Sequence, residues 1–276
     1  MWREILTAVL FGILEGVTEW LPISSTGHLI LLDRVLEMPL RPAVLELFEV
    51  VIQLGAILAV VVLFWHRLNP FSRKKSKAER GETFALWGKV LLATLPAAVV
   101  GFLLDDWMSE RLYRPLVVAA ALIVYGVAFL LLEKCRKRDP LTVQTADITP
   151  RIAFLVGCFQ MLSLVPGTSR SGSTILGGIL LGLSRPVAAE FSFFLGVPTM
   201  LGAGVLKGAK FLLEGNALTG NEVLLLSVGT LTAFLTSLVV IRFLMDFVRR
   251  HSFAGFGVYR ILLGGAVWIA SLLGIL

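Results

Sequence analysis

Six long apolar segments constrain the fold of this chain more than any other feature of its sequence. They lie near residues 44–64, 84–104, 115–132, 188–211, 223–243 and 255–275. Each is long enough for a helix that crosses the hydrocarbon core of a bilayer, which takes about 20 residues. Apolar residues fill 57% of the chain and charged residues only 16%, whereas soluble domains carry roughly 25% charged residues. The sequence therefore predicts an all-α polytopic membrane protein, a single integral membrane domain over residues 1–276.

The net charge of +6 comes from basic runs between the apolar segments, chiefly at 66–81, 133–139 and 249–251. Basic loops of this kind are typical of the cytoplasmic side of a membrane protein, so we expect no nucleic-acid partner. The loops at 105–115 and 212–222 then lie outside. The apolar N-terminus lacks the cleavage site of a signal peptide. The two cysteines make neither a disulfide framework nor a metal-ligand spacing.

Two further regions, 3–36 and 150–185, each hold an apolar run, a polar break and a second run too short to span. The first break is LPISSTGH (21–28) and the second break is VPGTSRSGST (165–174). Pro, Gly and hydroxyl residues interrupt a helix, which a bilayer tolerates only where protein or a wet cavity supplies hydrogen-bond partners. We expect two re-entrant helix–break–helix hairpins; a kinked full-length span is the alternative.

The two halves of the chain resemble each other. Ser24 and Gly27 of the first break match Ser169 and Gly172 of the second at an offset of 145. Repeat 1 covers about 1–132 and repeat 2 about 150–276, each predicted as one re-entrant helix hairpin plus three transmembrane helices. An odd number of crossings makes the second repeat inverted, so the hairpin tips can meet near mid-membrane. Inverted repeats with broken helices also occur in transporters, which sets up a second functional hypothesis.

Ionisable side chains within apolar segments are costly, so they are functional candidates. They are Glu15, Glu19, His28, Glu49, Arg170, Glu190 and Arg260. Glu15 and Glu19 lie four residues apart, on one face of a helix, where two carboxylates repel each other. A divalent cation, Mg²⁺ or Ca²⁺, bound by both and by a phosphate would relieve the repulsion.

The first break offers three hydroxyls and an imidazole. We expect Ser24 and Thr26 to bind phosphate with the N–H groups of a helix that starts near His28. Ser25 close to His28 is the minimal arrangement for an activated nucleophile, although hydroxyl-rich helix caps are common.

The second break adds a cation. A guanidinium at Arg170 suits the forked geometry of phosphate oxygens, and hydroxyl groups fill the remaining positions. The phosphate-binding hydroxyls are those of Ser169, Ser171, Ser173 and Thr174. An alternative is that Glu49 or Glu190 merely neutralises the arginine. We expect Glu49 and Glu190, which occupy equivalent places in the repeats, to support the breaks by accepting their N–H and O–H groups.

Five motifs together resemble the bacterial undecaprenyl-diphosphate phosphatase family, which is also linked to bacitracin resistance. They are EGVTE (15–19), LPISSTGH (21–28), FEVVIQLGAILAVV (48–61), PGTSRSGST (166–174) and EFSFFLGVP (190–198). The resemblance runs essentially from end to end, and the E-x-x-x-E and P-G-x-S-R-S-x-x-T signatures are met without a mismatch.

The resemblance implies hydrolysis of undecaprenyl diphosphate to undecaprenyl phosphate and inorganic phosphate, which recycles the lipid carrier for cell-wall synthesis. It also implies a bacterial cytoplasmic (inner) membrane location, a site facing the periplasm or outside, a divalent cation and a homodimer. Bacitracin would compete for the same lipid. Glu15 and Glu19 match the acidic motif, Ser25 and His28 match the nucleophile and acid/base candidates, and the Arg170 loop matches the phosphate site.

Two questions remain open on the sequence. Ser25 could attack the terminal phosphorus with His28 or Glu19 as base, or water could attack directly. A polyprenyl-phosphate flippase or transporter is the rival hypothesis; it needs no nucleophile and no carboxylate pair, so EGVTE with Ser25 and His28 favours an enzyme.

Overall fold

The computed structural model describes residues 1–135 and 139–276, except for the side chains at positions 105, 106 and 109. Residues 136–138, part of the predicted basic run at 133–139, lie outside this description. Six helices are long and apolar enough to cross a membrane, as predicted. They are α3 (Pro42–Leu63), α5 (Lys77–Leu112), α6 (Pro115–Cys135), α9 (Arg185–Leu213), α10 (Gly220–Arg250) and α11 (Ala254–Leu272). Within the described ranges there are no strands, so the all-α prediction is confirmed.

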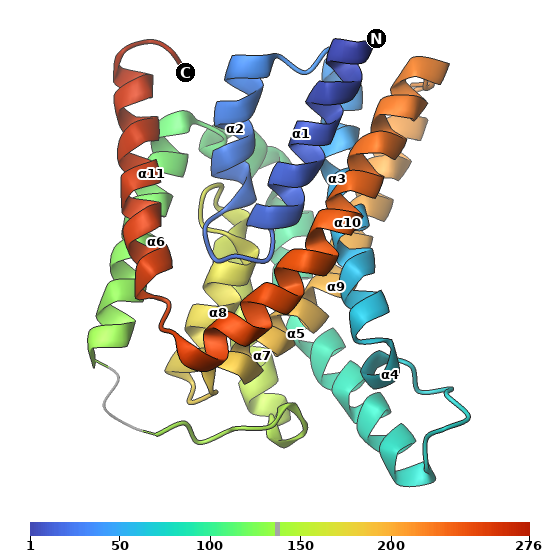
Figure 1. Cartoon of the computed structure of the whole chain (residues 1–276), viewed down its shortest axis with the longest axis vertical. Helices are drawn as coiled ribbons and strands as arrows, with labels where there is room; N and C mark the ends of the chain where they lie inside the picture. The colour runs from blue at the N-terminus through green and yellow to red at the C-terminus, as the bar shows by residue number, and fades with distance from the viewer. Residues whose placement is uncertain (136–138) are drawn as a thin grey trace.

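Four shorter helices form two hairpins, one around each polar break. They are α1 (Trp2–Thr18), α2 (Ser25–Leu36), α7 (Pro150–Met161) and α8 (Arg170–Leu180). A 12-residue helix such as α2 is only about 18 Å long, too short for a hydrocarbon core of about 30 Å. The two hairpins enter from opposite ends of the molecule, and their tips lie near mid-height (Figure 1). Because the chain reverses at each break, neither break is a kink in a continuous span; the inverted relation of the whole halves stays a prediction.

Glycines bring the first hairpin close to the long helices. A Cβ atom at Gly12 would lie 2.4 Å from the Gly229 carbonyl oxygen, and one at Gly16 would lie 2.7 Å from that of Ala233. The backbones of α1 and α10 therefore approach to a distance that only glycine permits, which is how small residues drive helix association in membranes. The hairpin tip is held against a fixed surface as a result.

Aromatic side chains of α9 pack against the end of the first hairpin. Phe191, Phe193 and Phe194 are fully buried, and the Trp20 ring packs edge-on against Phe193 with ring centroids 5.2 Å apart. Trp20 directly follows the carboxylate motif of the first hairpin. This packing places the end of α1 over α9.

The connecting segments contain short helical turns. They are α4 (Trp65–Leu68), η1 (Thr145–Asp147) and η2 (Leu162–Leu164). At the end of the molecule where the N-terminus lies, Arg41 donates two hydrogen bonds of 2.8 and 2.9 Å to Glu222 and so joins the start of α3 to the start of α10.

Candidate active site

The two breaks have the same local geometry. Ser24 and Ser169 are the N-cap residues of α2 and α8, with φ angles of 72° and 71°. Their hydroxyl oxygens accept hydrogen bonds from the Gly27 and Gly172 amides, at 3.4 and 3.1 Å. Positive φ in a residue other than glycine costs about 1–3 kcal/mol and persists where the surroundings enforce it. The same strained cap therefore starts both helices, at positions 145 residues apart.

The start of α2 differs from the prediction. The helix begins at Ser25, three residues before the expected start at His28, because Ser24 provides the cap. The free amides of its first turn belong to Ser25 and Thr26. They mark the positive end of the helix dipole, as do the first amides of α8, so two helix N-termini of opposite direction border the site.

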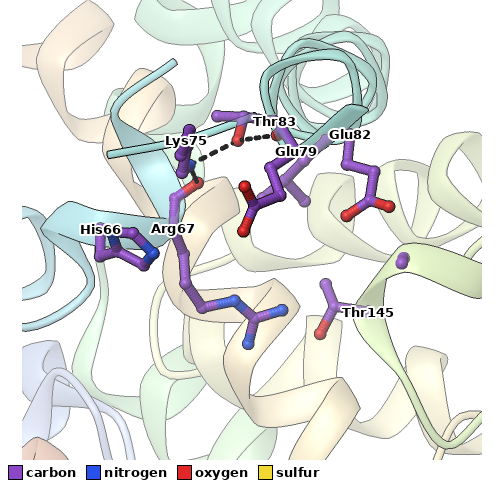
Figure 2. A pocket seen from close by; sticks show the side chains of 9 residues that line it. His66, Arg67, Lys75, Glu79, Glu82, Thr83 and Thr145 are labelled. Atoms are coloured by element: carbon purple, nitrogen blue, oxygen red, sulfur yellow. Dashed lines mark hydrogen bonds between the residues drawn. The ribbon is translucent and has the colours of Figure 1, made fainter. Parts of the chain in front are cut away.

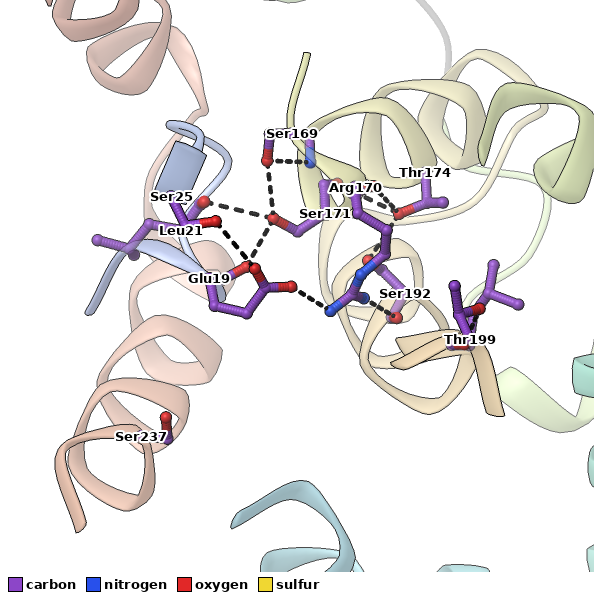
Figure 3. A network of polar contacts seen from close by, with 12 residues as sticks. Glu19, Leu21, Ser25, Ser169, Arg170, Ser171, Thr174, Ser192, Thr199 and Ser237 are labelled. Atoms are coloured by element: carbon purple, nitrogen blue, oxygen red, sulfur yellow. Dashed lines mark hydrogen bonds and ion pairs between the residues drawn. The ribbon is translucent and has the colours of Figure 1, made fainter. Parts of the chain in front are cut away.

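An ion pair between Glu19 and Arg170 joins the two hairpins (Figure 3). One Arg170 Nη2–Glu19 Oε1 hydrogen bond is 2.7 Å long, and Arg170 Nη1 donates to the Ser192 carbonyl oxygen of α9 at 2.6 Å. Both charged side chains are less than one-tenth exposed. The partner of Arg170 is thus Glu19, and not Glu49 or Glu190 as in the alternative considered above.

The same carboxylate contacts the candidate nucleophile. Ser25 Oγ donates to Glu19 Oε2 at 3.2 Å, and Ser171 Oγ donates to the Glu19 carbonyl oxygen at 2.9 Å (Figure 3). Glu19 therefore contacts Arg170, 151 positions away in the sequence, and one hydroxyl from each break. A serine next to a carboxylate that also pairs with a guanidinium is an arrangement capable of attacking a phosphate.

His28 has its hydrogen-bond partners outside this cluster. Its Nδ1 lies 2.7 Å from the Ser24 carbonyl oxygen, which only accepts, so Nδ1 is protonated in this tautomer. Its Nε2 lies 2.7 Å from the Tyr259 hydroxyl of α11. Among the described contacts none joins the imidazole to Ser25, so Glu19 is better placed than His28 to act as its base.

Glu15 is a buried carboxyl without a hydrogen-bond partner among the described residues. Its side chain is fully buried, and neither carboxylate oxygen has a hydrogen-bond partner within the described ranges. It lies one helical turn before Glu19, whose amide donates to the Glu15 carbonyl oxygen. An unpartnered buried carboxyl fits the predicted cation ligand. The described residues hold no cluster of three or more His, Cys, Asp or Glu, so water and substrate oxygens would complete the coordination.

Most hydroxyls of the second break are bonded to protein. Ser173 and Thr174 donate to the Arg170 carbonyl oxygen, and the Thr174 hydroxyl lies 2.7 Å from that of Ser192. The hydroxyls of Ser169 and Ser171 lie 3.1 Å apart. These bonds fix the first turn of α8 against α9. Direct phosphate contact by these hydroxyls, and by Thr26 in the first break, stays a prediction.

Glu190 does not support a break, which corrects the prediction. Its carboxylate accepts hydrogen bonds from Arg67 and Thr145, in the loops on the far side of the molecule from the chain ends. Arg67 and Thr145 also line a pocket of about 160 Å³ whose wall mixes acidic and basic side chains (Figure 2). Nor does any described hydrogen bond join Glu49 to a break; its carboxyl is half-buried on α3. The repeat match identified equivalent positions but not equivalent partners.

The sequence did not predict the contacts that three further residues make at the site. Arg260 of α11 was noted as an ionisable residue without a role, and it contacts both breaks. Gly196 of α9 lies against Arg170, where a Cβ atom would come within 2.7 Å of the guanidinium. Tyr259 contacts His28. Arg260 carried a signal, a charge inside an apolar span, and Gly196 lies within the EFSFFLGVP motif at 190–198.

Comparison with known proteins agrees with the resemblance seen in the motifs. The family model described as Bacitracin resistance protein BacA matches residues 8–266. A protein of Enterococcus faecalis named undecaprenyl-diphosphatase is 50% identical over 275 residues, covering 98% of this chain and 100% of the relative. Proteins of the same name from Streptococcus thermophilus and Limosilactobacillus fermentum are 53% and 52% identical over 262 residues, covering 95% of this chain and 91% and 95% of the relatives.

Proposed function

This chain belongs to the bacitracin resistance protein BacA family, and on that premise we propose that it hydrolyses undecaprenyl diphosphate to undecaprenyl phosphate and inorganic phosphate. The observation that supports this function best is the contact of Glu19 with both Ser25 and Arg170. This buried contact joins the three side chains that we propose as base, nucleophile and phosphate-binding cation. The product is the lipid carrier that cell-wall synthesis reuses, so the activity would also confer bacitracin resistance.

In the proposed reaction, Arg170 binds the terminal phosphate. Its Nε is buried without a partner in the described structure, and its Nη2 is paired with Glu19. The first-turn amides of α2 and α8 supply further positive potential, since positioning and electrostatics dominate phosphoryl transfer. Both helix N-termini are thus oriented for an oxyanion.

Ser25 Oγ then attacks the terminal phosphorus and gives its proton to Glu19. The O–P bond to the bridging oxygen breaks, Glu19 passes the proton to the leaving undecaprenyl phosphate, and the Glu19 carboxylate is regenerated. Water hydrolyses the phosphoserine with Glu19 as base and releases inorganic phosphate. His28, held by Ser24 and Tyr259, would serve as acid or base only after turning from its present bonds. Direct attack by water remains the competing route.

Glu15 and Glu19 would hold Mg²⁺ or Ca²⁺. The cation would supply charge neutralisation for the diphosphate. The support for this proposal is the buried Glu15 carboxylate, which has no other partner in the described part of the chain.

The cellular setting is proposed from the same premise. The chain is a multi-pass membrane protein. We place it in the bacterial cytoplasmic (inner) membrane with the first hairpin opening to the periplasm or outside, as a homodimer. Bacitracin would compete for the same lipid diphosphate.

Phosphate release from undecaprenyl diphosphate by the detergent-purified protein tests this function. We expect release that stops with EDTA and in Glu19→Gln. Asp246→Asn, at an exposed end of α10 remote from the breaks, is the matched control and should stay active. Binding of the lipid without release of phosphate would overturn the proposal. The relatives' names give no support to the transporter alternative.

The nucleophile is a separate question with its own test. A rapid acid quench followed by mass spectrometry should find phosphate on Ser25, and Ser25→Ala should lose activity. Ser227→Ala, on the exposed face of α10, is the control. Full activity in Ser25→Ala would establish direct attack by water and leave the overall reaction standing.

A further inference from the structure

Arg260 connects the two breaks through their backbones. Its Nη1 donates to the Pro22 carbonyl oxygen of the first break at 3.0 Å. Its Nη2 donates to the carbonyl oxygens of Gly167 and Thr168 in the second break, at 2.8 and 2.9 Å. The planar fork of a guanidinium fixes the angle between its donors, so these three bonds fix the distance between the two segments.

The side chain is fully buried, although α11 is an apolar helix at the edge of the molecule. The guanidinium packs closely against its neighbours. It lies 5.5 Å from the centre of the Tyr125 ring, and a Cβ atom at Gly172 would come within 3.1 Å of Nη1. A buried charge usually requires a counter-ion. Among the described contacts Arg260 has no carboxylate partner, only carbonyl dipoles.

We propose that Arg260 is a positioning residue for the reaction, because it sets the distance between the nucleophile segment of the first break and the Arg170 segment of the second. The catalytic part of this inference rests on the proposed function. Pro22 lies three residues before Ser25, and Thr168 lies two residues before Arg170, so the guanidinium acts on both reacting segments through backbone. It does not contact Ser25, Glu19 or Arg170 in the described structure.

Steady-state kinetics of phosphate release separate positioning from substrate binding. A displacement of about 1 Å between reacting groups costs on the order of 100-fold in rate. We expect Arg260→Met to lower kcat about 100-fold with KM within about threefold, and Arg260→Lys, which keeps one donor direction, to recover about tenfold of that loss. Arg242→Met removes an exposed arginine from α10 and should leave both constants unchanged.

A second measurement, the rate of thiol labelling, does not depend on phosphate release. Thr168 is 1% exposed, and its carbonyl is one of the three acceptors. In a Cys135→Ser, Cys158→Ser background, Thr168→Cys introduces a thiol that should react slowly with a maleimide while Arg260 is present. Arg260→Lys should raise the labelling rate at least about tenfold at an unchanged melting temperature, because local opening of the break sets that rate.

The two measurements distinguish the possible failures. If the wild-type protein releases no phosphate but Arg260→Lys exposes the thiol, the proposed function fails and the connecting role stands. If folded Arg260→Lys keeps both the slow labelling and the wild-type kcat, the positioning role is overturned. If Arg260→Met does not fold, the Arg260→Lys results alone decide.

Discussion

Glu19 is hydrogen-bonded to residues of both halves of the chain. Its two carboxylate oxygens contact Arg170 and Ser25, and its carbonyl oxygen accepts from Ser171. A buried ion pair is a weak source of stability, because desolvation offsets most of the attraction. The proposed function explains the pair better, because it holds the proposed base next to the proposed phosphate-binding cation.

Arg170→Lys tests whether the side chain at position 170 must donate hydrogen bonds to two acceptors in one plane. Lysine keeps the charge but cannot donate to both Glu19 and the Ser192 carbonyl oxygen in the plane that arginine provides. We expect kcat/KM to fall about 30-fold, or about 2 kcal/mol of transition-state stabilisation. Arg151→Lys, an exposed position in α7, is the control. Equal activity of the two variants would show that charge alone suffices at position 170.

Glu15→Gln tests the cation site. The amide has nearly the same shape as the carboxyl but no negative charge to offer a metal. We expect activity to fall at least about 100-fold, and the rise in melting temperature caused by Mg²⁺ or Ca²⁺ in the wild type to disappear, since a ligand stabilises only a fold that binds it. A variant that keeps both the thermal shift and EDTA-sensitive activity would remove Glu15 from the site.

At the scale of helices, the site is made where α2 and α8 begin. Each is capped by a serine with positive φ whose hydroxyl accepts from the third amide of the helix, so the first two amides have no side-chain cap. Helix α9 fixes this arrangement from below, through the Ser192 carbonyl oxygen and the close approach of Gly196 to Arg170.

Gly196→Ala tests that approach. The added methyl would lie 2.7 to 2.8 Å from the guanidinium atoms, which can shift because they end a flexible side chain. The protein should therefore fold, with kcat/KM lowered by about tenfold or more as Arg170 moves. Gly202→Ala is a matched control on the same helix, because its Cβ would meet nothing within 4 Å. Similar activity in both variants would count against a role for the glycine.

The sequence predicted the elements well, and predicted contacts less well. Spans and breaks follow from hydropathy and from Pro, Gly and hydroxyl residues, which act locally. The partners of Glu190, Tyr259 and Arg260 depend on which helices pack together, and that information is not local. Glu190 matches Glu49 in the repeat, yet it binds Arg67 and Thr145, because the two positions face different neighbours.

At the scale of the whole molecule, two hairpins enter from opposite ends and meet at their tips (Figure 1). Lipid leaves no solvent to satisfy a broken helix, so each break needs the other and the side chain of Arg260 as its hydrogen-bonding environment. The same constraint that makes a break costly makes the meeting point polar, and polar groups within lipid suit a charged headgroup on an apolar chain.

Accessibility of introduced thiols tests the orientation. In the background without native cysteines, a membrane-impermeant maleimide should label Glu214→Cys in intact cells, because the loop at 212–222 is expected outside. Arg73→Cys, in the basic loop at 66–81, should react only after permeabilisation. The opposite pattern would place the opening of the first hairpin in the cytoplasm.

The central claim is that Glu19 of the first hairpin and Arg170 of the second act as one site. Phosphate release from undecaprenyl diphosphate by wild type, Glu19→Gln, Arg170→Gln and the double variant measures their coupling. Residues that act as a unit are non-additive, so the double variant should be about as slow as the slower single variant. Multiplication of the two single effects, or a wild-type protein that releases no phosphate, would contradict the account.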